Sequence, residues 1–339
     1  MGGGITSSVL SMVDATPEID HHLYARARTA HDIGIELTER FSSVHVIPDN
    51  PLTAMLELRR LARHLFPDVI HAHSSIAGAL VRLAALDRPR IVYSPHCFAF
   101  ERRDITGVAR RVYTAVERSL ATRTDLFVAV APRELDLAAA LGYRRTAYVP
   151  NRTMCAPVSQ AHYRRPLRIV TAGRICGQKD WLYLVHLKRY IDRHIGVEAV
   201  WEWVGGGDAV GEAELGAVGI EVSGWLSQEE MLARMAQAQV YVHTAAWEAA
   251  PISILESASI GLPLAIRAIP PLESLRLPGL AADLVQLAGR VASLAEETAW
   301  LDAQRASYAI AATHSREWQG RHLLDAYTEA GALPPVALS

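Results

Sequence analysis

Short apolar segments alternate with amphipathic segments along most of the chain, and this order restricts the fold more than any other feature. Before residue 150 the apolar segments are Val44–Ile47, Val69–Ala72, Arg90–Ser94, Leu126–Val130 and Ala147–Val149. The segments with helical spacing between them are Leu52–Leu65, Gly78–Ala85, Val108–Ala121 and Glu134–Leu141. This order is typical of βαβ units, so we predict a parallel sheet covered by helices.

The pattern is interrupted once and then starts again. Residues 150–166 contain three prolines and no sustained periodicity, which predicts a linker. Beyond it we predict the strands Leu167–Ala172, Glu198–Val204, Gly219–Ser223, Val240–His243 and Leu264–Arg267. The helices predicted there are Trp181–Ile195, Gln228–Ala236, Ile252–Ile260 and Glu317–Ala330, the last with no strand after it. Because the length suffices for about two domains, we expect two doubly wound α/β domains, 1–155 and 156–313, followed by a helical segment, 314–339.

The composition excludes several classes of protein. Half of the residues are hydrophobic, 21% are charged and the formal net charge is −2, which excludes intrinsic disorder and argues against a nucleic-acid partner. No apolar run is long enough to span a membrane and no signal peptide opens the chain, so we expect a cytoplasmic protein. The three cysteines form no CxxC pair, and no Asp-any-Asp motif occurs, so we predict no metal site.

Two carboxylates define one candidate site. Glu248 follows the predicted strand Val240–His243, and Glu256 lies within the helix that begins near Pro251. The free N–H groups and the positive dipole end of that helix can bind a phosphate. Glu256 can accept hydrogen bonds from a ribose diol, and Glu248 can reach a sugar hydroxyl. Taken alone, the two carboxylates also fit an exposed loop and an exposed helix face.

A glycine-containing turn after the predicted strand Leu167–Ala172 carries two cations. Gly173 is followed by Arg174 and, five residues further on, by Lys179, which is one of only two lysines in a chain with 32 arginines. An arginine can bind a diphosphate through two parallel hydrogen bonds, and a lysine acts as a point charge. A solvated Arg–Lys pair is the alternative interpretation.

These motifs occur in order with Gly205-Gly206-Gly207 and Ser223-Gly224-Trp225, and over nearly the whole chain they resemble the retaining family 4 glycosyltransferases of the GT-B fold. The resemblance implies two Rossmann-like domains that face each other across a crevice, with a C-terminal helix that returns to the first domain. It implies that Arg174 and Lys179 hold the donor diphosphate, Glu248 the donor sugar and Glu256 the ribose. The further donor-binding residues that it implies are Gly173, Gly224, Trp225 and the backbone amides of Ile252, Ser253 and Ile254. Trp225 would stack on the nucleobase, with a position in the core as the alternative.

The first half of the chain supplies a second group of candidate residues. Gly3 and Gly4 resemble the family's glycine loop near the donor phosphate, where glycine permits close backbone approach and a positive φ. His96 matches the family's histidine that reaches the reacting sugar, and His73 and Ser74 resemble an acceptor-side loop. A structural role is the alternative for each histidine. The strand that this fold places before its glycine loop is missing, so we expect the natural N-terminus upstream of Met1.

Together these residues predict a metal-independent transfer of a sugar. Arg174, Lys179 and the helix end at Ile252 would stabilise the departing diphosphate, with His96 and Glu248 as the other catalytic residues. No cofactor is implied beyond a nucleotide-sugar co-substrate, which we expect to be UDP-linked. The acceptor would be a hydroxyl group of a glycan, a lipid-linked sugar or a small molecule. Ala249-Ala250 replaces the glycine and bulky aromatic residue of many members, which bears on the identity of the donor sugar.

Two other functions remain open at the level of sequence. UDP-sugar 2-epimerases share the two-domain fold, and a non-catalytic nucleotide-sugar-binding protein would need a similar pocket. We reject a glycosidase with Glu248 and Glu256 as its carboxylate pair, because Glu256 lies inside the predicted helix. The spacing of Gly205-Gly206-Gly207 does not fit GxGxxG, which argues against a dinucleotide cofactor.

The segment Glu101–Arg123 bears on whether the protein contacts a membrane. Its six arginines are Arg102, Arg103, Arg110, Arg111, Arg118 and Arg123. An ordinary surface helix is one interpretation of this segment. The other is a basic face near anionic lipid or a lipid-diphosphate acceptor, at the inner face of the membrane.

Overall fold

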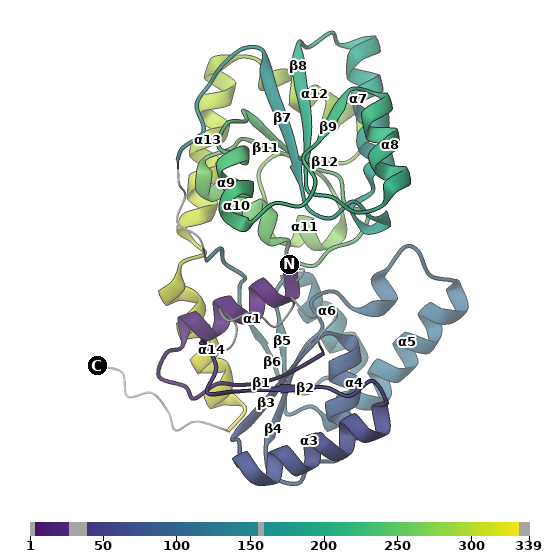
Figure 1. Cartoon of the computed structure of the whole chain (residues 1–339), viewed down its shortest axis with the longest axis vertical. Helices are drawn as coiled ribbons and strands as arrows, with labels where there is room; N and C mark the ends of the chain where they lie inside the picture. Colours follow the sequence, from purple (N-terminus) through teal and green to yellow (C-terminus); the bar gives the residue numbers. More distant parts are fainter. Residues whose placement is uncertain (1–3, 27–38, 155–158, 332–339) are drawn as a thin grey trace. The chain divides into compact units, whose positions relative to one another are not determined.

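A computed structural model describes residues 4–26, 39–154 and 159–331 of the chain (Figure 1). The chain divides into two compact units: unit 1 comprises Met1–Arg152 and Ser315–Ser339, and unit 2 comprises Thr153–His314. The domain limits predicted from sequence, at residues 155 and 314, lie next to these limits, and residue 155 itself is outside the described residues. No helix among the described residues is long and apolar enough to span a bilayer.

Unit 1 contains parallel strands and surrounding helices. Its strands are β1 (His22–Ala25), β2 (Ser43–Val46), β3 (Val69–His73), β4 (Arg90–Ser94), β5 (Leu126–Ala129) and β6 (Thr146–Tyr148). Its helices are α1 (Gly4–Ala15), α3 (Pro51–Leu65), α4 (Ser75–Leu83), α5 (Gly107–Leu120), α6 (Pro132–Leu141) and α14 (Arg316–Glu329), with the short 3-10 helices η1 (Ala99–Glu101) and η2 (Ala121–Arg123). The five strands predicted for this half are all present, and β1 is an additional one.

The strands of unit 1 form two sheets rather than the single sheet that a doubly wound domain implies. One is a parallel pair, β1–β2, and the other has the order β3-β4-β5-β6, also parallel. Within the described residues no strand precedes α1. The aromatic core of this unit includes Tyr93, Phe98 and Phe127, which contact one another across β4 and β5.

Unit 2 is a doubly wound sheet. Its strands are β7 (Leu167–Ala172), β8 (Ala199–Val204), β9 (Ile220–Val222), β10 (Val240–His243), β11 (Leu264–Arg267) and β12 (Leu280–Ala281). All pairs are parallel, and the order is β12-β11-β10-β7-β8-β9. The chain therefore proceeds outward from β7 in one direction and then outward from β10 in the other. The β7–β10 boundary is the topological switch point, where ligands bind in open α/β sheets.

The helices of unit 2 cover both faces of this sheet. They are α7 (Trp181–His194), α8 (Ala209–Ala217), α9 (Gln228–Met235), α10 (Ile252–Ile260), α11 (Pro270–Ser274), α12 (Leu284–Ser293) and α13 (Glu297–Ala312), with the 3-10 helix η3 (Gly177–Lys179). Two hydrophobic clusters, one around Trp201 and Trp203 and one around Tyr241 and Trp300, fill the two sides. The helix α8 is absent from our prediction because Gly211 and Gly216 interrupt its helical pattern.

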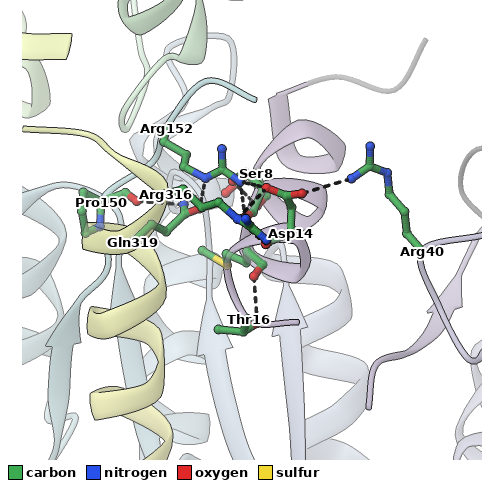
Figure 2. A network of polar contacts seen from close by, with 10 residues as sticks. Ser8, Asp14, Thr16, Arg40, Pro150, Arg152, Arg316 and Gln319 are labelled. Atoms are coloured by element: carbon green, nitrogen blue, oxygen red, sulfur yellow. Dashed lines mark hydrogen bonds and ion pairs between the residues drawn. The ribbon is translucent and has the colours of Figure 1, made fainter. Parts of the chain in front are cut away.

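The C-terminal helix α14 packs on unit 1, as the resemblance implies. Asp14 at the end of α1 forms ion pairs with Arg152, with Arg40 and with Arg316 of α14 (Figure 2). Gln319 of α14 accepts from Arg152 Nε at 3.1 Å and donates to the carbonyl of Pro150 at 2.9 Å. These contacts join four segments of unit 1, at Asp14, at Arg40, at residues 150–152 and in α14.

Candidate active site

Two loops meet at the switch point of unit 2, one after β7 and one after β10. The Thr244 hydroxyl donates to the carbonyl of Lys179 at 2.9 Å, and the Ala246 amide donates to the carbonyl of Gln178 at 2.9 Å. The side-chain amide of Gln178 donates to the carbonyl of Trp247 at 3.1 Å. The turn that carries Lys179 is therefore bound directly to the loop that carries Glu248.

Lys179 and Glu248 form the central pair of this site. Lys179 Nζ lies 2.7 Å from Glu248 Oε1, and the two side chains are only 17% and 12% exposed. The aliphatic part of Lys179 passes over Gly173, where an added Cβ would lie 3.2 Å from Lys179 Cε. Gly173 also has φ of 131°, a conformation that favours glycine. The structure thus brings together Gly173, Lys179 and Glu248, three residues that the sequence selects.

A second ion pair fixes this turn, and the sequence analysis missed it. Asp180 has φ of 49° and accepts from the Tyr183 amide as the N-cap of α7. Its other carboxylate oxygen accepts from Arg267 at the end of β11, at 2.6 Å, and Arg267 also donates to the Thr244 carbonyl. The Arg267 guanidinium stacks over the Tyr183 ring, 4.1 Å from its centroid. Arg267 holds the Lys179 turn in place from a strand almost ninety residues away.

Glu256 lies in α10, and its carboxylate is buried. Its side chain accepts from the amide of Gln228 at 2.9 Å, and burial raises the pKa of Glu256. Gln228 is the first residue of α9 and was not among the predicted site residues. Of the amides expected to face a phosphate, that of Ile254 donates to the Pro251 carbonyl, whereas Ile252 and Ser253 occupy the first turn of α10, where amides lack partners within the helix.

His243, at the end of β10, is another residue that sequence reasoning missed. It is 1% exposed, and its Nδ1 lies 3.2 Å from the Tyr241 hydroxyl. Its Nε2 has no hydrogen-bond partner among the described residues. Burial lowers the pKa of His243 well below its ordinary value, and the nearby Lys179 lowers it further, so the imidazole is neutral. The buried imidazole of His243 thus lies near the charge of Lys179.

The other donor-side residues occupy different environments. Arg174 is exposed, and Trp225 is 62% exposed, so Trp225 is no part of the core. Gly224 has φ of 70°, and an isolated bridge joins it to Gly205. A Cβ at Gly205 would lie 2.2 Å from the Gly173 carbonyl oxygen, so this glycine lets the end of β8 approach the turn after β7. Close packing of the backbone is therefore sufficient to explain a glycine at position 205.

Unit 1 contains a cluster of partly buried histidines, His71, His73 and His96, at the ends of β3 and β4. His73 Nδ1 lies 2.9 Å from His96 Nε2, and the rings of His71 and His73 lie 4.0 Å apart. Burial lowers the pKa of His71 to about 3 and that of His96 to about 4, and it lowers the pKa of His73 as well. The cluster is therefore neutral near pH 7. The predicted residues His73 and His96 do lie together.

A carboxylate that the sequence did not point to holds the His96 loop. His96 and Cys97 have φ of 52° and 88°, which is uncommon for residues with a side chain. Glu134, 1% exposed in the first turn of α6, accepts from the Cys97 amide at 2.9 Å and from the Val130 amide at 2.8 Å. Burial raises the pKa of Glu134 to about 7. These bonds stabilise a loop conformation that is unfavourable by itself.

Two of the residues predicted in the first half lie at the starts of helices. Ser74 is the N-cap of α4 and accepts from the Ala77 amide at 3.3 Å, so its hydroxyl stabilises a helix end. Gly4 is the first residue of α1 and has no positive φ, so at this position the chain is helical rather than the expected glycine loop. Gly3 lies outside the described residues. Among the described residues, no group of three His, Cys, Asp or Glu side chains could hold a metal ion.

Comparison with known proteins agrees with this fold. Residues 3–152 match the sequence profile of the glycosyl transferase 4-like domain. A protein of the cps region of Klebsiella pneumoniae is 23% identical over 303 residues, which cover 84% of this chain and 83% of that protein. An alpha-1,3-galactosyltransferase of Escherichia coli that acts on a diphosphoundecaprenol-linked sugar is 24% identical over 237 residues, 62% of this chain and 60% of that enzyme.

Solved structures with the same fold cover almost the whole chain. HepE of Anabaena, in complex with UDP and glucose, has a TM-score of 0.77 at 15% identity and covers 96% of both chains. Sucrose-phosphate synthase of Thermosynechococcus elongatus has a TM-score of 0.76 at 16% identity, with coverage of 98% of this chain and 94% of that chain. The chain therefore has the GT-B fold of nucleotide-sugar-dependent glycosyltransferases. Its first half matches the glycosyl transferase 4-like domain, and the chain is a glycosyltransferase. The epimerase and non-catalytic alternatives are not favoured.

Proposed function

We propose that this enzyme transfers a sugar from a UDP-sugar to a hydroxyl group of a glycoconjugate acceptor, with retention of anomeric configuration and without a metal ion. The observation that carries the proposal is the ion pair of Lys179 and Glu248, 2.7 Å apart and largely buried at the switch point of unit 2. Lys179 would neutralise the leaving diphosphate, and Glu248 would bind the donor sugar.

The surroundings of this pair support a nucleotide diphosphate as the ligand. The first turn of α10 offers amides and a positive dipole end beside Glu248, and Glu256 is buried one turn further on, where it would accept from the ribose. Exposed Trp225 would stack on the uracil ring, and exposed Arg174 would bind the diphosphate. HepE binds UDP and glucose in its solved complex, which favours UDP as the donor nucleotide here as well.

The acceptor is proposed to be part of a glycoconjugate assembled in a bacterial cytoplasm, at the inner face of the membrane. The galactosyltransferase of Escherichia coli acts on a lipid-linked sugar, and the related protein of Klebsiella pneumoniae belongs to a cps region. In unit 1, His96 would contact the reacting sugar. His73, whose Nδ1 lies 2.9 Å from His96 Nε2, would lie on the acceptor side. A small-molecule acceptor is the alternative, and a screen of acceptors distinguishes it from a glycoconjugate acceptor.

The test is an assay of UDP release from UDP-glucose, UDP-galactose and UDP-N-acetylglucosamine, with and without lipid-linked and soluble sugar acceptors. We expect slow hydrolysis of one donor without acceptor and much faster release with the right acceptor. The largest thermal shift in a panel of these donors identifies the preferred one. Epimerised sugar in place of transferred sugar, or no chemistry with any donor, would contradict the proposal.

The chain offers a matched control for the role of Lys179, because its only other lysine is Lys188. Lys188 lies on α7 and pairs with Asp192 at 2.6 Å. We expect Lys179→Ala to lower kcat by about 100-fold to 1,000-fold, and Lys188→Ala to leave it unchanged. An equal effect of the two substitutions would refute the assignment.

Two further measurements test the finer parts of the proposal. Proton NMR of the first-formed product reports the anomeric configuration, which we expect to be that of the donor. Activity that persists in EDTA, after dialysis against a chelating resin, supports a metal-independent reaction. A product with inverted anomeric configuration would overturn the proposed retention. Activity that returns only with a divalent ion would overturn the proposed metal independence.

A further inference from the structure

Gln228, the first residue of α9, is a hydrogen-bond partner of the buried carboxylate of Glu256. Its side-chain amide donates to Glu256 Oε1 at 2.9 Å, and Glu256 is only 5% exposed. The two residues lie 28 positions apart, on the neighbouring helices α9 and α10 of unit 2. Among the residues that the structure describes, Glu256 takes part in no ion pair. A neutral amide therefore satisfies one oxygen of this carboxylate, and the carboxylate can still accept from a ligand.

The start of α9 does not need the Gln228 side chain. Ser227 and Glu230 form a capping box, in which Ser227 Oγ accepts from the Glu230 amide at 3.2 Å and Glu230 Oε2 accepts from the Ser227 amide at 2.8 Å. These two bonds satisfy amides that the helix itself leaves without partners. The capping box thus fixes the position of Gln228, and the side chain of Gln228 extends to a different helix. Helix capping therefore does not explain the bond to Glu256.

Gln228 also acts on the charge of Glu256. Burial raises the pKa of Glu256, whereas the hydrogen bond from Gln228 and the charge of Lys179 lower it. Lys179 Nζ lies 2.7 Å from Glu248, so its direct partner is the other carboxylate of the site. The amide of Gln228 stabilises the ionised form of Glu256 by a direct bond. An ionised carboxylate accepts at both oxygens and donates at neither, which suits a ligand with hydroxyl donors.

The loop before α9 carries the residue that we propose for the nucleobase. Trp225 is 62% exposed between β9 and α9, and Gln228 follows it by three residues. The Ser223 hydroxyl fixes this loop, because it accepts from the Gly205 amide at 3.0 Å and donates to the Gly224 carbonyl at 2.9 Å. Three residues span at most about 11 Å. Because one bond joins the base and the ribose of a nucleoside, Trp225 and Gln228 can serve the same nucleoside.

We propose that Gln228 positions the Glu256 carboxylate to accept from the ribose hydroxyls of the donor nucleotide, and that this bond makes the site selective for a ribonucleotide over a deoxyribonucleotide. Gln228 is a positioning residue, since it acts on the ribose through Glu256. The inference rests on the proposed function, in which Glu256 binds the ribose, and it adds the residue that holds Glu256 in place.

The selectivity follows from the cost of a buried acceptor that loses its donor. A site built to accept from a hydroxyl group rejects an analogue without that hydroxyl, because the acceptor is left unpaired. Deoxy-UDP, which lacks the 2′ hydroxyl, should therefore bind about 10-fold to 100-fold more weakly than UDP. The preference depends on a carboxylate with a fixed orientation, because ordering a free side chain on binding reduces the gain.

Calorimetric titration of UDP and deoxy-UDP tests the inference without any need for catalysis. The two nucleotides are titrated into the unmodified chain and into the Gln228→Leu variant. We expect Gln228→Leu to weaken the binding of UDP by about fivefold or more and to change the binding of deoxy-UDP much less. The preference for UDP should fall to about threefold or less, because the contact that Gln228 supports is the one that deoxy-UDP lacks.

Two further variants separate hydrogen-bond donation from the size of the side chain. Gln228→Glu keeps the size and replaces the donor by a second carboxylate beside Glu256, so it should weaken the binding of UDP at least as much as Gln228→Leu. Gln286→Leu is the matched control, since Gln286 lies in the first turn of α12 and accepts from the Ala282 amide at 3.1 Å. It should bind both nucleotides like the unmodified chain. The capping box of α9 is intact in both Gln228 variants, so we expect unchanged melting temperatures without ligand.

The possible outcomes distinguish this inference from the proposed function. Equal losses of affinity for UDP and deoxy-UDP in Gln228→Leu would indicate a purely structural role and would overturn the inference. Binding of UDP by Gln228→Glu with the affinity of the unmodified chain would overturn it as well. If the unmodified chain binds UDP without any preference over deoxy-UDP, the inference fails and UDP remains the donor nucleotide. If the unmodified chain binds neither nucleotide, the proposed function fails, and the inference fails with it.

Discussion

The ion pair of Arg82 and Glu117 provides the sharpest test of how unit 1 is held together. Arg82 is fully buried, and its guanidinium donates to Glu117 at 2.9 Å, to the Tyr143 hydroxyl at 2.7 Å and to the Gly78 carbonyl at 2.8 Å. It also lies 4.0 Å from the centroid of the Tyr93 ring. Glu117 is the one carboxylate that compensates this charge in the ion pairs of the described residues.

The substitution Glu117→Gln keeps the size of the side chain and removes its charge. Arg82 stays protonated at any accessible pH, so a buried cation would be left without its counter-ion. Removal of one partner from such a pair costs about 3–5 kcal/mol. For a unit of this size, that corresponds to a fall in the melting temperature of roughly 6–20 °C.

Differential scanning calorimetry measures this effect, since the two units have separate cores and need not unfold as one transition. We expect the transition of unit 1 to move and that of unit 2 to stay. Arg82→Met combined with Glu117→Leu should recover part of the loss, because no unpaired charge is then left in the core. A shift of less than about 2 °C in the Glu117→Gln variant, the size typical of a surface substitution, would refute the reasoning.

Four further outcomes follow from the described contacts. Glu134→Gln weakens the hydrogen bonds to the Cys97 and Val130 amides. It should lower kcat in the transfer assay by up to about 100-fold and leave the KM for the donor unchanged. A change in the donor KM alone would contradict this prediction. Gly205→Ala should lower the free energy of unfolding of unit 2 by roughly 2–6 kcal/mol, because the added Cβ clashes with the Gly173 carbonyl and the backbone has φ of 137°. Urea unfolding measures this effect, and a midpoint equal to that of the unmodified chain would contradict it. The pKa of His71 is lowered to about 3, so its neutral form contributes full stability above pH 6.5, and this stability is lost as the pH falls toward 3. His71→Gln should therefore flatten the acid side of the stability curve of unit 1 by at most about 1.4 kcal/mol per pH unit. An unchanged slope would refute this prediction. UDP should protect Lys179 but not Lys188 from acetylation, as read by mass spectrometry, and equal labelling would contradict the donor site.

Much of the fold follows from local patterns along the chain. All ten predicted strands are present, as are the helices predicted in both halves, because apolar runs of strand length and helical spacing are local signals. The prediction missed β1, which has four residues, and α8, which contains two glycines. It also missed β12 and the helices α11, α12 and α13. The split of the unit 1 strands into two sheets involves pairing between distant segments, which no local pattern encodes.

The site divides in the same way. Lys179, Glu248 and Glu256 were identifiable from motif spacing, because each follows a strand or lies in a helix that opens at a ligand-binding edge. Arg267, Gln228 and Glu134 were not, since each acts through a partner 28 to 87 residues away. Nothing in the local sequence distinguishes these three residues, because their partners become neighbours only in the folded chain.

The sequence by itself determined the alternation of strands and helices, the order of the glycosyltransferase motifs and the scarcity of lysine that singles out Lys179. Only the tertiary structure decided that β7 and β10 are neighbours, and this neighbourhood brings Lys179 to within 2.7 Å of Glu248. Strand order is set by the burial of whole sheet faces and by hydrogen bonds between distant segments. These are properties of the packed chain and leave no mark in the spacing of residues along it.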